Sequence, residues 1–285
     1  MASLKDLRRR IRATKNMQQI FKAMEMVSAA KLRRAQQRAQ AASPYAAKIT
    51  EMLANLAGSA SELEHPLFKV REVKTTALVV VTSQRGFCGA YNSNLIRATE
   101  QRLRAAAPGT IQLVLIGKKG NDYFRRRNWP ILAAYTDLPG EANLEFARRI
   151  MQDLTEHFTS GTVDRVEVMY SHFLNALSRK IVTEVFLPVG ASESQVVPQD
   201  RGTIFEPDPE IIFGELLPRY ASAKLYAGMA DALACEYSAR MVAMGSARKN
   251  AGELVDSLTL TRNRLRQAAI TKEIAELVGG VEALK

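Results

Sequence analysis

The feature that most constrains this chain is its last 67 residues, 219–285, which contain no proline although ten prolines precede them. Apolar side chains recur there every three or four positions, which is the period of one helix face. A helix of this length would extend about 100 Å at 1.5 Å per residue. A compact domain cannot cover so long a stripe, so the pattern predicts a shaft that needs a partner helix or an enclosing protein. The apolar positions are Leu225, Met229, Leu233, Leu254, Leu258, Leu265, Ile270, Ile274, Leu277, Val281 and Leu284.

A candidate partner helix lies at the other end of the chain. Residues 3–42 show helical spacing, with Ser3 as the N-cap and good helix formers throughout. Pro44 predicts a break or kink, after which residues 45–57 resume the spacing. Two such helices running antiparallel would form a coiled coil. Its seam is irregular, which suggests that part of the surface faces a third partner; the polar residues near the seam are Ser28, Lys31, Glu236 and Arg240.

Positive charge is concentrated in the N-terminal segment. The chain has a net charge of +11, and residues 1–48 hold twelve Lys and Arg against Asp6 and Glu25. Such a helix could bind nucleic acid, an acidic membrane surface or an acidic protein, or could simply be solvated. Phe21 is the one aromatic residue among the first 44, so platforms for stacking nucleic-acid bases are missing. The sequence therefore favours a protein partner and argues against nucleic acid.

Several classes of protein are disfavoured by composition. No apolar stretch approaches the roughly 18 residues that span a bilayer. The two cysteines, Cys88 and Cys235, are far apart and give no disulfide framework. The three histidines are scattered without the spacing of metal ligands. The basic start continues its helical pattern into Ala42, which disfavours a cleaved transit peptide. We therefore expect no metal and a reducing, cytoplasmic setting.

The middle of the chain predicts an α/β module. Buried-strand patterns occur at residues 75–82, 111–116, 131–135, 163–170 and 178–188, and the last of these could be antiparallel. Helical patterns lie between them at 92–107, 118–128 and 144–160. This alternation is typical of a Rossmann-like domain with a mostly parallel sheet. We expect an N-terminal shaft helix in residues 1–60, a central α/β domain in 61–206, and a C-terminal shaft helix in 207–285 that pairs with 1–60.

Glycines after two of the strands raise the possibility of nucleotide binding. The first strand runs into Gln84-Arg85-Gly86-Phe87-Cys88-Gly89, and the second runs into Gly117-Lys118-Lys119-Gly120. Neither segment has the dinucleotide or the P-loop spacing. Cys88 beside Arg85 could be an activated thiol, but a structural role is favoured because no histidine is nearby in sequence. The sequence offers no catalytic group and no cofactor site.

Three motifs resemble one family in order along the chain. Lys22-Ala23-Met24-Glu25-Met26-Val27-Ser28 resembles the N-terminal helix of the gamma subunit of the F-type ATP synthases. Ser83-Gln84-Arg85-Gly86-Phe87-Cys88-Gly89 resembles its SDRGLCG segment, with Gln84 and Phe87 as departures. Residues 266–276, RQAAITKEIAE, resemble its C-terminal signature. The resemblance extends from end to end and is of the bacterial type.

The resemblance implies a fold and a function. The terminal helices would be the central rotor shaft inside a ring of alternating alpha and beta subunits. The α/β domain would sit on the c-ring with the epsilon subunit. Rotation of the proton-driven c-ring would then change the conformation of the beta-subunit catalytic sites. ATP chemistry would belong to the beta subunits, so this chain would be non-catalytic. It would be peripheral at the cytoplasmic face of the bacterial plasma membrane, contacting the membrane only through the Fo sector.

The resemblance also implies contact residues, grouped by partner. Those that meet the beta subunits would be Met24, Arg266 and Gln267. Those that meet the c-ring at the foot would be Phe205, Glu206 and Asp208. Those that turn in the upper bearing would be Leu277 and Val281.

Simpler roles and other functions remain open on sequence alone. Met24 could be seam packing, and Arg266 a solvated charge. A nucleic-acid-binding coiled coil predicts affinity that falls steeply with salt. A nucleotide-dependent enzyme predicts saturable binding of a dinucleotide to the isolated chain. The rotor interpretation predicts neither, and it predicts that the isolated chain aggregates through its exposed apolar stripe.

Overall fold

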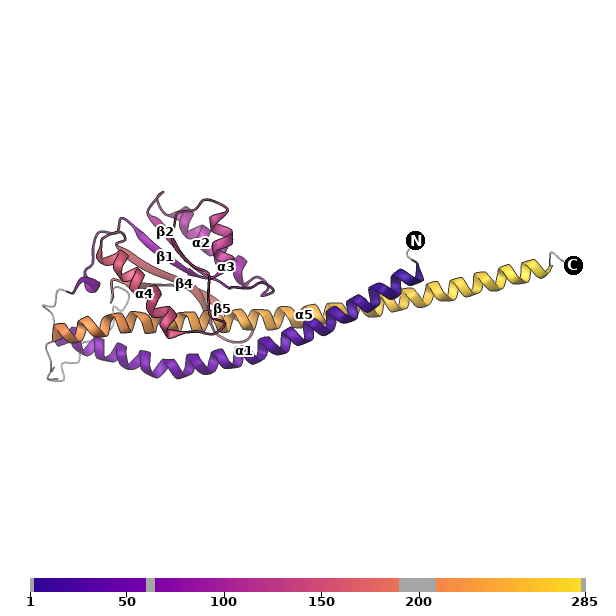
Figure 1. The fold of residues 1–285 in the computed structure, drawn as a ribbon, viewed down its shortest axis with the longest axis horizontal. Coiled ribbons are helices and arrows are strands. Elements are labelled where there is room, and N and C mark those ends of the chain that lie inside the picture. Colours follow the sequence, from indigo (N-terminus) through magenta and orange to yellow (C-terminus); the bar gives the residue numbers. More distant parts are fainter. Residues whose placement is uncertain (1–2, 60–64, 190–208, 283–285) are drawn as a thin grey trace. The chain divides into compact units, whose positions relative to one another are not determined.

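The computed structural model describes residues 3–59, 65–189 and 209–282, although many side chains near the foot of α1, at the start of α5 and beyond Val278 lie outside the description. Figure 1 shows two long helices from the ends of the chain and an α/β module from its middle. The elements are α1 (Leu4–Ser59), a 3-10 turn (Pro66–Phe68), β1 (Thr76–Val81), α2 (Tyr91–Ala105), β2 (Ile111–Ile116), α3 (Lys118–Arg125), β3 (Ile131–Tyr135), α4 (Leu144–Thr159), β4 (Arg165–Phe173), β5 (Arg179–Leu187) and α5 (Pro209–Glu282).

The module is a five-stranded sheet with the order β3-β2-β1-β4-β5. β1 pairs in parallel with both β2 and β4, and β2 pairs in parallel with β3. β5 is antiparallel to β4 at the edge. All six residues of β1 are buried, as expected for a central strand covered on both faces. The predicted fold class, long terminal helices with a mostly parallel sheet, is confirmed.

Alternation along the strands creates two cores. On one face, Ala77, Val79 and Val81 of β1 pack with α4 and with the first part of α5. On the other face, Leu78 and Val80 pack with α2 and α3. Figure 1 shows α4 and the α2–α3 pair on opposite sides of the sheet. The residues of α5 in the first cluster include Leu217, Leu225 and Met229, and those in the second are Cys235 and Ala239.

The two long helices continue through prolines at which the sequence predicts that they break or begin. α1 continues through Pro44, where a break or kink is expected. One proline removes one hydrogen bond of the ladder, at a cost of about 3 kcal/mol, and the helix formers around it supply the remaining bonds. α5 begins at Pro209 and contains Pro218, so the helix starts before the proline-free stretch. A proline in the first helical position loses nothing, because its missing N–H would have no partner in the helix.

Ser3 caps α1 as predicted. Its Oγ accepts a hydrogen bond from the Asp6 N–H at 3.1 Å and donates to the Asp6 carboxylate at 2.9 Å. The hydrogen bonds with Ser3 lower the pKa of the Asp6 carboxyl. The negative charge of Asp6 therefore lies in the first turn of α1, where the helix dipole favours it.

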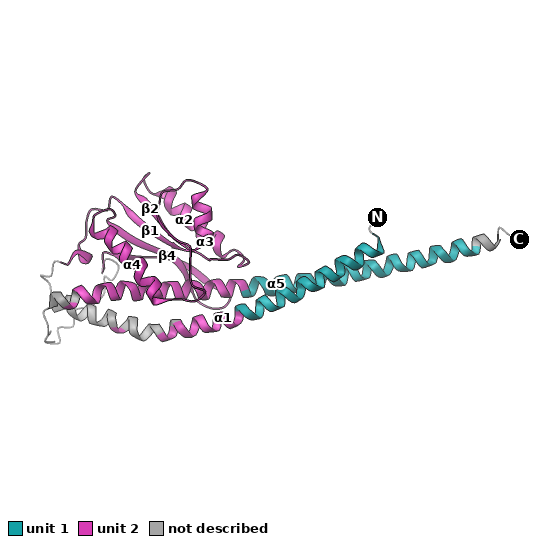
Figure 2. Cartoon of the chain, in the orientation of Figure 1, with its two compact units in different colours: residues 1–28, 241–285 teal, residues 29–240 magenta. Residues whose placement is uncertain are grey.

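The chain forms two compact units, and each long helix contributes to both (Figure 2). The first unit contains residues 1–28 and 241–285, and the second contains residues 29–240. In the first unit the Glu25 carboxylate pairs with Arg248 at 2.8 Å. Gly252 lies close to Gln18, so the two helices run in opposite directions. Leu7, Ile11 and Val255 are buried in this unit, as a helix seam requires.

Gly117 provides a test of the turn between β2 and α3. Its φ of +101° is unfavourable for other residues, and a Cβ there would lie 2.3 Å from the Thr82 carbonyl oxygen. We expect Gly117→Ala to lower the unfolding free energy by more than about 2 kcal/mol, because left-handed strain adds to a backbone clash. Denaturant unfolding measures the loss. The matched control is Gly109→Ala, where φ is +82° but nothing lies within 4 Å. Equal losses in both variants would show that strain alone matters.

Candidate functional site

The candidate site lies where the strand order of the sheet reverses. β1 is followed by α2 and β2 on one side, while β4 lies on its other side. In open α/β sheets, ligands bind beyond the carboxyl ends of the strands at this position. Here the carboxyl end of β1 leads into residues 82–90, which contain the predicted Gln84–Gly89 segment. A bound nucleotide would therefore contact this segment.

Side-chain hydrogen bonds fix the loop after β1. The Ser83 Oγ donates to the Arg85 carbonyl at 2.7 Å, and the Ser83 N–H donates to the Asn92 Oδ1 at 3.1 Å. The Asn92 Nδ2 lies 3.1 Å from the Cys88 Sγ. Phe87 has a φ of +61° and is 70% exposed, so the loop holds an unfavourable backbone conformation at its tip. The loop is therefore held rigidly by its own side chains.

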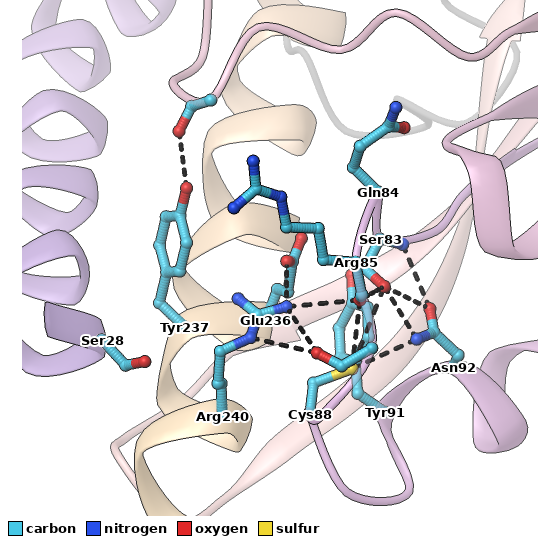
Figure 3. Close-up of polar contacts among 12 residues, drawn as sticks. Ser28, Ser83, Gln84, Arg85, Cys88, Tyr91, Asn92, Glu236, Tyr237 and Arg240 are labelled. Atoms are coloured by element: carbon cyan, nitrogen blue, oxygen red, sulfur yellow. Dashed lines mark hydrogen bonds and ion pairs between the residues drawn. The ribbon is translucent and has the colours of Figure 1, made fainter. Parts of the chain in front are cut away.

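Arg240 of α5 binds this loop from the other side (Figure 3). Its guanidinium donates to the Gly86 carbonyl at 3.1 and 3.2 Å and to the Arg85 carbonyl at 3.3 Å. It also pairs with the Glu236 carboxylate at 2.6 Å, one helical turn away. Both side chains are buried, and burial raises the pKa of the Glu236 carboxyl while Arg240 acts to lower it. The arginine thus ties α5 to the loop through directional bonds.

These contacts occupy the place where a nucleotide would bind. A phosphate site needs backbone N–H groups directed into the crevice. Instead the loop directs the carbonyl oxygens of Arg85 and Gly86 toward Arg240. The fully buried Tyr91 hydroxyl donates to the Ala232 carbonyl of α5 at 3.2 Å. Residues of α5 therefore bond to this edge of the sheet, and these bonds favour a structural joint over a ligand site.

The two cysteines have structural positions. Both are free and buried. Burial raises the pKa of the Cys88 thiol and raises that of Cys235 to about 12. Thiols with raised pKa values carry little thiolate at neutral pH and are poor nucleophiles. The structural role predicted for Cys88 therefore fits its environment better than activation by Arg85.

A second group of α5 side chains holds the end of β4. The Asp231 carboxylate contacts the His172 ring and the Phe173 N–H. The Cys235 Sγ donates to the Ser171 carbonyl at 3.3 Å. Ser238 donates to the Ala176 carbonyl in the turn after β4. Together with Arg240, these residues attach two and a half turns of α5 to the carboxyl ends of β1 and β4. We call residues 231–240 of α5 with their sheet partners the joint.

Sequence reasoning found only part of the joint. It noted Glu236 and Arg240 only as polar residues near the seam of the predicted coiled coil, where they suggested a third partner; their spacing of four residues was the available signal that they meet. It missed Asp231 and His172, because the partners lie 59 positions apart and single residues of this kind carry no spacing signal. It placed the loop Gln84–Gly89 correctly after the first strand.

The structure places four of the predicted contact residues and leaves the others outside its description. Met24 is partly buried in the first unit, and its carbonyl accepts from the Ser28 hydroxyl at 2.7 Å. Arg266 and Gln267 are exposed, and Leu277 is 71% exposed. Their contacts with other subunits stay predictions. The residues outside the description are Phe205, Glu206, Asp208 and the side chain of Val281.

Among the described residues, His, Cys, Asp and Glu side chains do not gather in any group of three that could hold a metal ion. None of the helices, as far as they are described, is both long and apolar enough to cross a bilayer.

Solved structures share this fold. The central stalk of the Tetrahymena thermophila mitochondrial ATP synthase, solved with its c-ring, is 25% identical, with a TM-score of 0.65 over 80% of this chain and 99% of that one. A chain of the Euglena gracilis mitochondrial ATP synthase is 20% identical, with a TM-score of 0.71 over 99% and 94% of the two chains. At that identity the second likeness shows the fold alone.

Sequence comparison gives the family. The profile of the ATP synthase family, described as "ATP synthase", matches residues 3–284. The ATP synthase gamma chains of Moorella thermoacetica and Desulforamulus reducens are each 44% identical, over the whole of both chains. That of Chloroherpeton thalassium is 41% identical over 100% of this chain and 99% of its own. This chain therefore belongs to the gamma-chain family of the ATP synthases, whose members are the central-stalk subunits of these complexes.

Proposed function

We propose that this chain is the rotor shaft of an F1Fo ATP synthase, coupling proton-driven rotation of the c-ring to conformational changes at the beta-subunit catalytic sites. The observation that carries the proposal is the exposed end of α5. In the first unit Glu25 faces Arg248 and Gln18 faces Gly252. With this antiparallel register, α1 begins before it can pair with the last turns of α5, and those turns extend beyond it. From Arg266 to Val278, every described side chain but that of Ala269 is exposed.

That end carries an apolar stripe. The exposed apolar residues recur at helical spacing and are between 48% and 71% accessible: Ile270, Ile274, Leu277 and Val278. An apolar surface of this kind marks a protein interface. We infer that the ring of alternating alpha and beta subunits encloses it. The epsilon subunit and the c-ring would bind the α/β domain of residues 61–206. Segments 1–60 and 207–285 would act as the two shaft helices.

The chain would contribute no catalytic group to the complex. Tyr91, Glu236 and Arg240 occupy the crevice of the α/β module with mutual and backbone contacts, which supports a mechanical role. ATP synthesis and hydrolysis would then occur on the beta subunits. The bacterial relatives support a peripheral location at the cytoplasmic face of the plasma membrane, with membrane contact only through the Fo sector.

The contact residues are proposed by their match to the family motifs. Arg266 and Gln267 would meet a loop of the beta subunit, and their exposure leaves them accessible for it. Met24 would pass the moving part of the beta subunit. Leu277 and Val281 would turn in the upper bearing. Phe205, Glu206 and Asp208 would contact the c-ring.

The composition of the native complex tests the proposal. A tagged copy of this chain should co-purify as a single copy with alpha, beta and epsilon subunits, and the mass of the intact assembly should reflect this. The apolar stripe of α5 favours this assembly, because enclosure by partner subunits removes it from water. Recovery with nucleic acid, or as an oligomer of this chain alone, would overturn the proposed function.

Gln267 tests the shaft contact separately from folding. We expect Gln267→Leu to reduce ATP synthesis by membrane vesicles about fivefold, because a lost hydrogen bond at a coupling contact is worth about 1 kcal/mol. The unfolding transition of the chain should move little, since the side chain is exposed. Gln101→Leu on α2 makes the same exposed chemical change away from the shaft and should synthesise ATP normally. Normal synthesis by the Gln267 variant would remove that residue from the mechanism.

A further inference from the structure

One face of α5 is buried although it belongs to neither core of the sheet. Ala230, Leu233 and Tyr237 are at most 9% exposed, and they follow one another at the spacing of a helix face. Neither hydrophobic core, as described, contains them. The residues that cover this face come from α1 and from the loop between β3 and α4. At the joint, α5 is therefore held from a second side, away from the sheet.

Tyr237 connects this face of α5 to the loop and to α1. Its hydroxyl donates to the Gly140 carbonyl at 2.5 Å (Figure 3). The centroid of its ring lies 5.5 Å from the Lys31 Nζ of α1, which is within the range of a cation–π contact. A tyrosine suits this position, because its ring can be buried while its hydroxyl reaches a partner. One side chain of α5 thus contacts two other elements.

The same loop also pairs directly with α1. The carboxylate of Glu141 forms an ion pair with Arg38. Lys31, Arg34 and Arg38 are spaced by three and four residues, so they share one face of α1. Part of the positive charge that the sequence concentrates in the N-terminal helix is therefore used within the chain, on this loop and on the tyrosine ring of α5.

The three elements meet around a cavity of about 20 Å³. Its lining includes Arg34 and Ala35 of α1, residues 140–142 of the loop and Leu233 of α5. A space of this size has room for about one water molecule and is far too small for an organic ligand. The cavity therefore marks a packing interface between the two helices and the loop, and not a binding site.

The contacts of Tyr237 continue into the joint. The Arg240 guanidinium, which binds the loop after β1, lies 5.8 Å from the centroid of the Tyr237 ring. Lys31 also acts on the neighbouring Glu236: burial raises the pKa of the Glu236 carboxyl, while Arg240 and Lys31 act to lower it. Through these side chains, α1 is connected to the same edge of the sheet as α5.

We propose that the loop of residues 140–142, Tyr237 and the basic face of α1 form a latch that fixes both long helices to the α/β module. The latch matters for α1 because neither hydrophobic core includes a described residue of that helix. Under the proposed rotor function, the latch makes α1, which carries Met24, turn together with the module. That role rests on the proposed function, whereas the latch itself does not. Arg38 and Glu141 are positioning residues, since neither meets a nucleotide.

Charge reversal tests the latch, and the readout is hydrogen exchange of the amides of residues 31–38 in the native assembly from which the tagged chain is purified. Arg38→Glu replaces an attraction with a repulsion between carboxylates, so exchange should rise about fivefold. Adding Glu141→Arg restores an attractive pair in the reverse order. The double variant should therefore exchange within about twofold of the wild type, because the two changes interact directly.

Arg33→Glu is the matched control, because it reverses the charge of an exposed arginine on another face of α1. It should leave the exchange of residues 31–38 close to that of the wild type. Arg38→Gln and Glu141→Gln form a milder pair for the case that charge reversal prevents assembly, and their double variant should exchange no faster than either single variant. Independent, multiplying effects of the two changes, or no rescue by the reversed pair, would show that the latch is wrong.

The pumping ratio of the assembled complex tests the role of the latch in rotation. We expect Arg38→Glu to pump fewer protons per ATP hydrolysed at an unchanged rate of hydrolysis, and the double variant with Glu141→Arg to regain the wild-type ratio. A weakened fold would lower both activities together, whereas slip between module and shaft lowers only their ratio. An unchanged ratio in Arg38→Glu would overturn the role in rotation. Recovery of the chain without alpha and beta subunits would contradict the proposed function, while exchange in that assembly would still decide the latch.

Discussion

The attachment of the sheet to α5 depends on residues 231–240 of the helix. In this short segment, residues that pack into the core alternate with residues that hydrogen-bond to the sheet. Cys235 and Ala239 pack into the core beside α2 and α3. Asp231 and Arg240 reach the ends of two adjacent parallel strands. Because the carboxyl ends of β1 and β4 meet at the same edge of the sheet, one stretch of helix can hold both. The rest of the module is fixed through these two strands, since β2, β3 and β5 pair outward from them.

The buried charges in this run are better explained by orientation than by stability. Replacing a buried ion pair with apolar residues of similar volume is often neutral or stabilising, so Glu236 and Arg240 are not needed merely to hold the helix down. Arg240 also satisfies the carbonyl groups of Arg85 and Gly86, which a methionine or leucine could not do. Apolar packing would accept several rotations of α5, whereas this set of donors and acceptors accepts one.

Periodicity predicted the elements because each depends mainly on its own residues. The strand β2 and the start of α4 fall where the sequence places them, since buried runs and turn residues mark them locally. The continuation of α1 through Pro44 could not be read in the same way, because proline locally predicts a break or kink. Within α5, Leu217 next to Pro218 is fully buried in the core, so tertiary packing there outweighs the local preference of proline.

The joint shows a second limit of sequence reasoning. Glu236 and Arg240 are recognisable, because their spacing on one helix predicts that they meet. Asp231 and His172 meet only because β4 ends beside that turn of α5, which is a property of the tertiary fold. The family motifs identify segments that are typical of the family, but they do not show which side chains connect these segments in the fold.

Two regions of α5, the joint and the stretch beyond Arg266, have opposite requirements, and their surfaces differ accordingly. At the joint, specific bonds fix one orientation. Beyond Arg266 the apolar residues form a stripe and not a uniform coat, since Lys272 and Glu276, which pair at 3.5 Å, fall on the opposite helix face. A uniformly apolar cylinder would contact an enclosing ring equally at every angle and could not favour one state of a site over another. A stripe presents apolar and charged surface in turn, so each angle of the shaft has a different contact energy with each surrounding subunit. That difference is what coupling between rotation and a distant site requires.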